Sequence, residues 1–128
     1  MIDHIGLSVS DFEMAKRFYA AALAPLNMSL LMEFPASVTG SVDVAGFGEA
    51  PKPEFWVQTG GKAAPRLHIA FRASSRAVVD AFWHAAIAAG GTDNGAPGLR
   101  PHYHPNYYGA FIIDPDGHNI EAVCHDPA

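Results

Sequence analysis

The residues of this chain best suited to chemistry are two histidines and one glutamate: His4, His68 and Glu121. Each histidine begins a short segment in which apolar and polar residues alternate, and Glu121 lies in a similar segment near the C-terminus. Such alternation predicts half-buried β-strands, whose successive side chains point to opposite faces. If Ile5 and Ile69 pack into the core, both histidines point to the other face.

Glu121 is poorly explained by packing, because it stands between the apolar residues Ile120 and Ala122. A carboxylate buried without a partner is costly, so Glu121 requires a cation or a strong hydrogen-bond donor. Two imidazoles and one carboxylate on a shared face suit a divalent metal ion, and Zn, Fe, Mn, Ni and Co all accept such ligands. Taken singly, each residue is more often an ordinary core or surface residue. The shared face favours the metal site.

An internal repeat positions these residues. Shifting the chain by 64 residues places HIGLSVSDFEMAKRFYAAALA, which starts at His4, over HIAFRASSRAVVDAFWHAAIA, which starts at His68. An offset of half the chain length is typical of one module used twice. In each copy a helix is expected after the first strand. The first helix begins at Ser10 or Asp11 and ends at Pro25, and the second begins at Ser74 or Ser75 and ends at Gly90-Gly91.

Strands and turns follow each predicted helix. We expect strands at residues 28–34, 38–47 and 53–59 in the first copy, strands at 107–113 and 118–125 in the second, and a loop-rich stretch at 92–106. The sequence DPDG, Asp114 to Gly117, favours a tight turn that makes the last two strands an antiparallel hairpin. The pattern predicts an α+β fold in a single domain, residues 1–128, made of module 1 (about 1–60) and module 2 (about 65–128).

Composition limits the partners of the chain. Hydrophobic residues make up 49% and charged residues 16%, as in a compact globular protein. The net charge of −5 and the lack of a basic run argue against nucleic acid. No apolar run approaches the roughly 20 residues that cross a bilayer, and the N-terminus lacks the features of an export signal. Cys124 is the only cysteine, so no internal disulfide forms, and we expect a cytoplasmic protein.

A second polar cluster lies in GLRPHYHPNYYG, from Gly98 to Gly109. Loops on rigid scaffolds often carry binding and catalytic groups. In this interpretation Arg100 and Tyr103 bind substrate, while His104 and Tyr108 move protons or hold an oxyanion. The alternative, which the sequence supports equally, is a proline-braced loop that covers a sheet edge or a dimer contact.

The opening HIGLSVSD, the second HIAF strand and the closing AFIIDPDGHNIEAV resemble the vicinal oxygen chelate superfamily. That superfamily includes glyoxalase I, extradiol dioxygenases, bleomycin- and fosfomycin-resistance proteins and methylmalonyl-CoA epimerase. The resemblance implies two tandem βαβββ modules whose curved mixed sheet encloses a cleft, often completed in a homodimer. By position it also implies metal ligands at His4, His68 and Glu121.

The resemblance implies a fourth ligand on the last strand of module 1, within PEFWVQTG. The 64-residue offset from Glu121 gives Val57, and a shift of one residue gives Trp56 or Gln58. None of the three is acidic, so the chain departs from glyoxalase I and is closer to the two-histidine, one-carboxylate pattern of iron dioxygenases. We expect Gln58 to be a weak ligand, or Trp56 to form a wall against a planar substrate.

These features favour a metal-dependent enzyme, a lyase, an isomerase or a dioxygenase, that chelates a small substrate through neighbouring oxygens. Glu121 would then serve in catalysis as well as in metal binding. The alternative is a metal-free binding protein that sequesters an aromatic compound by stacking on aromatic side chains, namely Trp56, Tyr103, Tyr107 and Tyr108. A regulatory dimer with a vestigial site is a third hypothesis, for which the sequence offers no specific support.

Overall fold

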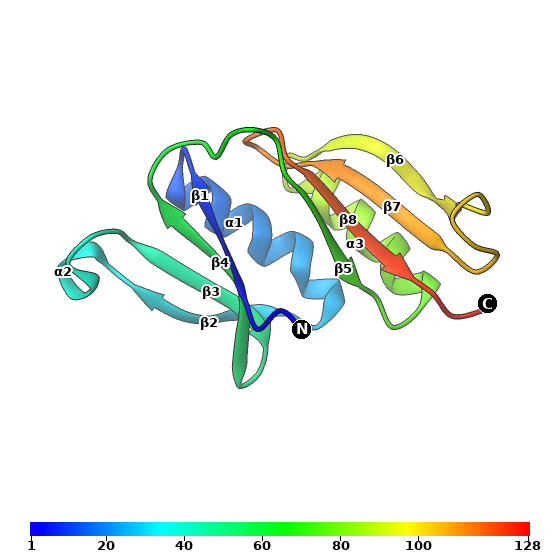
Figure 1. Ribbon diagram of the computed structural model, residues 1–128, viewed down its shortest axis with the longest axis horizontal. Coiled ribbons are helices and arrows are strands. Elements are labelled where there is room, and N and C mark those ends of the chain that lie inside the picture. The colour runs from blue at the N-terminus through cyan, green and yellow to red at the C-terminus, as the bar shows by residue number, and fades with distance from the viewer.

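The computed structural model describes residues 1–128 as two four-stranded mixed sheets, each covered by one main helix (Figure 1). Module 1 contains β1 (Ile5–Val9), α1 (Phe12–Leu23), the 3-10 helix η1 (Ala24–Leu26), β2 (Ser29–Phe34), α2 (Ala36–Thr39), β3 (Val44–Glu49) and β4 (Lys52–Thr59). Module 2 contains β5 (His68–Arg72), α3 (Arg76–Ala88), β6 (Thr92–Leu99), β7 (Tyr108–Ile113) and β8 (Asn119–Cys124). The strand orders are β1-β4-β3-β2 and β5-β8-β7-β6. Both sheets therefore have the same topology, and the predicted α+β fold is confirmed.

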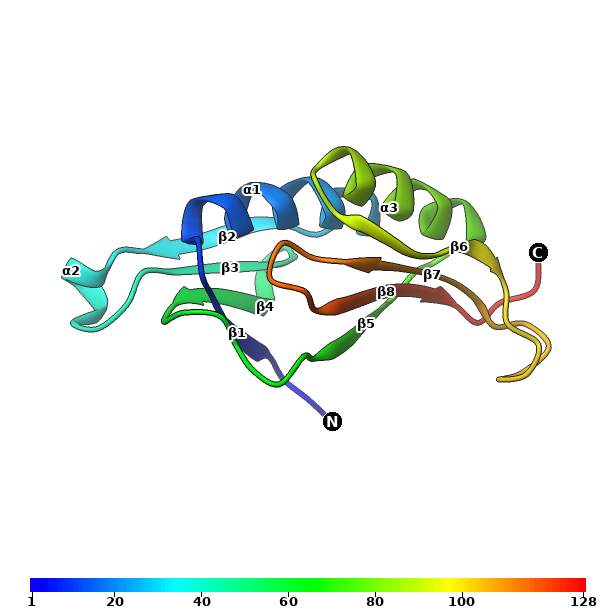
Figure 2. The same cartoon turned by 90° about the horizontal axis from the view of Figure 1, so that it is seen from above.

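Both main helices begin at the residues that the sequence offered as caps. The Asp11 side chain accepts a hydrogen bond from the Met14 backbone N–H at 3.0 Å, and Ser75 does the same for Val78 at 3.2 Å. These bonds satisfy amide groups that the first helical turn leaves without partners. The two helices lie on the same side of the sheets (Figure 2). Their apolar faces are buried there, and the opposite faces of both sheets are left open.

Two sequence predictions about strands were wrong. The strand expected at 38–47 begins only at Val44, because α2 occupies residues 36–39 and ends at Gly40, whose φ is 78°. The stretch expected to be a loop contains β6, an edge strand that pairs with β7 through two register shifts. Its sequence, TDNGAPGL, has only one residue, Thr92, of the β-branched and aromatic kinds that predict a strand. The strand forms because β7 supplies its hydrogen-bond partners.

The predicted DPDG turn joins the two modules. Asp114 is buried and accepts a 2.5 Å hydrogen bond from the hydroxyl of Tyr19 on α1, and Asp116 accepts hydrogen bonds from the backbone N–H and the hydroxyl of Ser10. Burial, and next the charge of Asp114, raise the pKa of Tyr19 well above its ordinary value. The turn thus connects the last hairpin of module 2 to the helix of module 1.

His118, which follows this turn, is fully buried. Its Nδ1 accepts a hydrogen bond from the Leu67 N–H at 3.0 Å.

None of the helices combines the length and the hydropathy that crossing a bilayer requires. Whether the two modules fold as one domain stays a prediction.

Candidate functional site

The open face of module 2 carries a buried carboxylate with two side-chain partners. Glu121 on β8 is only 1% exposed. Its Oε1 lies 2.8 Å from Nε2 of His68 on β5, and its Oε2 accepts a hydrogen bond from the Tyr107 hydroxyl. A carboxylate only accepts hydrogen bonds, so His68 Nε2 carries the proton in this contact. His68 itself remains about half exposed, since 54% of its side chain is accessible.

Strand register explains why these residues meet. Ala70 on β5 is opposite Glu121 on β8, and His68 is opposite Asn119, so His68 and Glu121 share the face away from α3. Burial, and next the hydrogen bond to Glu121, raise the pKa of the Tyr107 hydroxyl. Tyr107 therefore keeps its proton at neutral pH and acts as a donor to the carboxylate.

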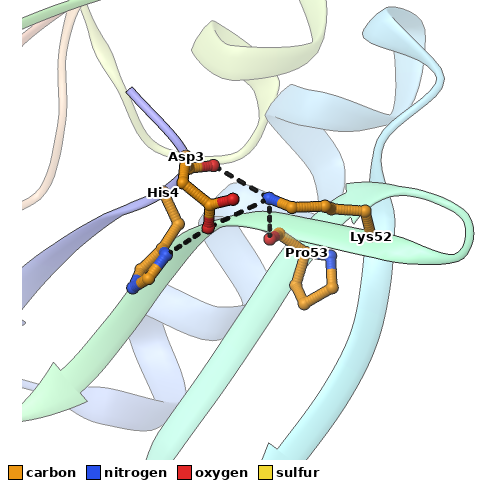
Figure 3. A network of polar contacts seen from close by, with 4 residues as sticks. All are labelled: Asp3, His4, Lys52 and Pro53. Carbon is orange, nitrogen blue, oxygen red and sulfur yellow. Dashed lines mark hydrogen bonds and ion pairs between the residues drawn. The ribbon is translucent and has the colours of Figure 1, made fainter. Parts of the chain in front are cut away.

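His4, the third predicted ligand, is held at a different place. Its Nδ1 lies 2.7 Å from the carboxylate of Asp3, and Lys52 forms an ion pair with the same carboxylate at 3.3 Å. Lys52 also donates hydrogen bonds to the backbone carbonyls of Asp3 and Pro53, which ties the N-terminal segment to the start of β4 (Figure 3). The hydrogen bonds from His4 and Lys52 lower the pKa of Asp3. His4 Nδ1 is thus the donor, and its Nε2 presents a lone pair.

The structure therefore brings together two of the three predicted ligands. His68 and Glu121 are in contact, whereas His4 contacts neither, and no group of three or more His, Cys, Asp or Glu side chains is arranged to hold a metal ion. His4 and His68 do line the same hollow, of about 590 Å³, between β1 and β5. Glu54 on β4 also lines it.

The residue of module 1 that corresponds to Glu121 is a tryptophan. Gly6 on β1 is opposite Trp56 on β4, as Ala70 is opposite Glu121 in module 2. The repeat offset at this strand is therefore 65 (121 − 56), the shift of one residue that the sequence allowed. Val57, which the uncorrected offset selects, is fully buried against the helix side.

Trp56 and Gln58 lie on the open face of module 1. Together with His4 they line a second hollow, of about 490 Å³. His4 is thus on the border between this hollow and the hollow shared with His68. The expected roles of Gln58 as a weak ligand and of Trp56 as a wall against a planar substrate stay predictions.

The loop before β7 contains Arg100 and Tyr103, which the sequence predicts to be substrate-binding residues. Arg100 donates hydrogen bonds to the backbone carbonyls of Gly98 and Ala96, both at 2.8 Å, and its guanidinium lies over the Phe111 ring. It is engaged in bracing its own loop. Tyr103 is 59% exposed, and its ring centroid is 4.8 Å from that of Tyr107.

His104 accepts a hydrogen bond from the Asn106 N–H at Nδ1, so its Nε2 donates to Nδ1 of His125, 2.8 Å away. Both rings contact the ring of Tyr107 edge-on, at centroid distances of 5.5 and 5.4 Å. His104 therefore reaches Glu121 only through Tyr107.

The structure brings Tyr107, and not Tyr108, to Glu121. The Tyr108 hydroxyl donates a 2.7 Å hydrogen bond to Asp80 on α3, on the opposite side of the sheet. Residue 107 has the same parity as Gly109, which packs near Glu121 on the open face, and residue 108 has the opposite parity. Asp3 was also missed, because a carboxylate next to a histidine in sequence gives no pattern to recognise.

Comparisons with known proteins agree with this fold. A family model described as the glyoxalase/bleomycin resistance protein/dioxygenase superfamily matches residues 1–122, and the chain belongs to that family, the vicinal oxygen chelate superfamily. A glyoxalase/bleomycin resistance protein from Albidiferax ferrireducens is 29% identical, with 98% of this chain and 99% of that chain covered and a TM-score of 0.78. No curated protein matches the sequence.

Two further solved structures share the fold at lower identity. Glyoxalase I from Zea mays, in an E144Q mutant form, is 22% identical over 95% of this chain and 46% of that chain, with a TM-score of 0.73. The fosfomycin resistance protein FosX from Listeria monocytogenes is 18% identical over 98% of this chain and 92% of that chain, with a TM-score of 0.69. At these identities the likeness concerns the fold alone.

Proposed function

We propose that this protein is a metal-dependent enzyme in which His68 and Glu121 hold a divalent cation and His4 supplies a third ligand. A small substrate would chelate the cation through two neighbouring oxygens, in lyase, isomerase or dioxygenase chemistry. The observation that carries the proposal is the contact between His68 Nε2 and a carboxylate that is almost completely buried.

The donor set fits a cation of this kind. Two donors bound to one cation at about 2.0–2.2 Å lie about 3 Å apart. His68 Nε2 and Glu121 Oε1 are separated by 2.8 Å, so a cation can replace the shared proton with little movement of either side chain. A carboxylate and a neutral imidazole suit zinc and the divalent first-row transition metals alike.

His4 has the geometry of a ligand that is already oriented. A metal-bound histidine usually donates its other ring N–H to a carboxylate, which fixes the ring and its tautomer. Asp3 does this for Nδ1 of His4 and leaves Nε2 available on the exposed side of the ring. Tyr107 has the corresponding role for Glu121, because its hydroxyl occupies Oε2 and leaves Oε1 to face His68.

The separation of His4 from the other two residues supports a homodimeric site. Within one chain the three donors do not converge. We propose that module 1 of one protomer meets module 2 of its partner, so that His4 of one chain joins His68 and Glu121 of the other. Closed two-fold dimers of this kind produce two equivalent sites.

The bound cation would supply Lewis-acid stabilisation of negative charge that develops on a substrate oxygen. The residues of the chain orient that chemistry. Tyr107 holds the carboxylate, Asp3 holds His4, and the hollow lined by Trp56 and Gln58 receives the part of the substrate that does not touch the metal.

Equilibrium metal binding tests the proposal. The wild-type protein, stripped with a chelator and titrated with Zn²⁺ or Co²⁺, is expected to bind about one equivalent per chain. His68→Ala and Glu121→Gln should each lose binding, and His84→Ala, which removes an exposed histidine on α3, should not. Wild-type protein that binds less than a tenth of an equivalent would count against the proposal.

A second candidate function is metal-free binding of an aromatic compound, which the placement of Trp56 in its hollow favours. The two candidates differ in their dependence on His68. A His68→Ala variant that keeps full affinity for the natural ligand would support sequestration and would contradict metal-dependent chemistry.

A further inference from the structure

The open face of module 1 contains a contact between an aromatic residue and a glycine on the neighbouring strand. Gly46 on β3 is directly opposite Trp56 on β4. A Cβ added to Gly46 would lie 2.8 Å from two atoms of the six-membered ring of Trp56 and 2.9 Å from a third. The indole therefore lies flat across Gly46, and no larger residue at position 46 permits this.

The exposed part of this indole belongs to a hollow and is not covered by other parts of the chain. Trp56 is half-buried and lines the hollow of about 490 Å³. The polar side chains that line this hollow are those of Asp3, His4, Lys52 and Gln58, and Asp3 is engaged by both His4 and Lys52. Gly6 on β1 also lines it, and a Cβ there would meet only Gln58, at 3.9 Å. Space therefore remains above the indole on the side of β1.

The same face continues as an apolar surface on the neighbouring strand. Met32 on β2 is opposite Gly46, and Phe34 is opposite Val44, so both side chains lie on the face that carries Trp56. Each is 40% exposed. Module 1 thus presents an aromatic and aliphatic surface at the point where module 2 presents the polar group of Glu121.

We propose that this surface is the subsite for a planar, largely apolar part of the ligand, which stacks on Trp56 while its polar end points toward His4 and Gln58. Module 1 has the indole of Trp56 at the position where module 2 has the carboxylate of Glu121. The indole lies flat because Gly46 has no side chain. A flat aromatic floor selects planar groups over puckered groups of the same size. The subsite deepens the proposed function, because it names the substrate class of that site, and its test does not require the metal.

The test is a titration in the presence of EDTA, followed through the two tryptophan indole N–H signals in NMR spectra. Phenol and cyclohexanol serve as probes, since both have six ring carbons and one hydroxyl and only phenol is planar. We expect phenol to shift the Trp56 signal, to leave Trp83 on α3 unchanged, and to bind at least threefold tighter than cyclohexanol (a stacking contact amounts to about a two- to twelvefold effect).

Variants locate the subsite. Trp56→Phe keeps a planar ring and should bind phenol within about threefold of wild type, whereas Trp56→Leu should weaken binding by about tenfold. Gly46→Ala should weaken it similarly, because the added Cβ lifts the indole. Gly6→Ala is the matched control, since its Cβ fits the same hollow without a clash.

Equal affinity for phenol and cyclohexanol in the wild-type protein, or a shift of Trp83 alone, would overturn the proposal whether or not the variants fold. Unchanged phenol affinity in folded Trp56→Leu protein would do the same. Because EDTA removes any cation, loss of the metal proposal would leave this result intact, and a negative result here would leave the metal site untouched.

Discussion

The hydroxyl of Tyr107 offers a sensitive perturbation of the proposed metal centre. Tyr107→Phe removes the donor from Oε2 of Glu121 and keeps the ring that packs against His104 and His125. A hydrogen bond to a charged group contributes about 1.5–3 kcal/mol. About 1.4 kcal/mol corresponds to a tenfold change in a binding constant, so the loss predicts a decrease in metal affinity of about 10- to 100-fold, the range expected for groups that orient ligands.

The matched control is Tyr108→Phe, whose hydroxyl is bonded to Asp80 on the opposite side of the sheet. Competition titration of Zn²⁺ against a chromophoric chelator would give the dissociation constants of wild type and both variants at pH 7.5. We expect weaker binding in Tyr107→Phe alone. Affinity within threefold of wild type in that variant, or an equal decrease in both, would refute the role assigned to Tyr107.

Two further predictions concern the contacts between modules and between chains. Tyr19→Phe should lower the free energy of unfolding at pH 7 by about 1.5–3 kcal/mol, because it removes a buried hydrogen bond to Asp114. The raised pKa of Tyr19 means that its contribution is complete below the unfolded pKa of about 10 and is lost as the pH rises above it. Urea denaturation from pH 7 to pH 11 should therefore show a steeper decrease in wild type than in Tyr19→Phe, and parallel curves would contradict this. For the dimeric site, His4→Ala and His68→Ala proteins that are unfolded, mixed and refolded should recover about a quarter of the wild-type metal sites, because a mixed dimer contains one intact pair. No recovery, in a mixture shown to contain mixed dimers, would place all ligands of a site in one chain.

The sequence predicted those features that rest on strong periodicity or local turn chemistry. The 64-residue repeat, the helix caps at Asp11 and Ser75 and the DPDG turn are all present in the structure. The caps and the turn depend on contacts within a few residues along the chain, and the repeat is visible because the same strand and helix patterns occur twice in the sequence. Such contacts are encoded by the types and the order of the residues themselves.

The features that the sequence missed depend on pairing between strands. β6 forms although Gly95, Pro97 and Gly98 weaken its strand propensity, since β7 supplies its hydrogen-bond partners. The sequence predicts neither the distance between His4 and His68 nor the face of β4 that carries Trp56. Only the register of β1 with β4 shows that Trp56, rather than Val57, corresponds to Glu121.

The choice of Tyr108 over Tyr107 has a related cause. The two tyrosines are adjacent in sequence and point to opposite faces, and their assignment requires the position at which β7 begins. That boundary is poorly marked, because the preceding loop is itself rich in aromatic residues and histidines.

The most direct test of the proposed metal site is the anomalous scattering of a crystal grown with Zn²⁺ from protein that was first treated with a chelator. The proposed function predicts a metal peak within about 2.0–2.2 Å of Nε2 of His68 and of a carboxylate oxygen of Glu121. A metal bound elsewhere on the chain, with the hydrogen bond between His68 and Glu121 intact, would contradict the proposed site.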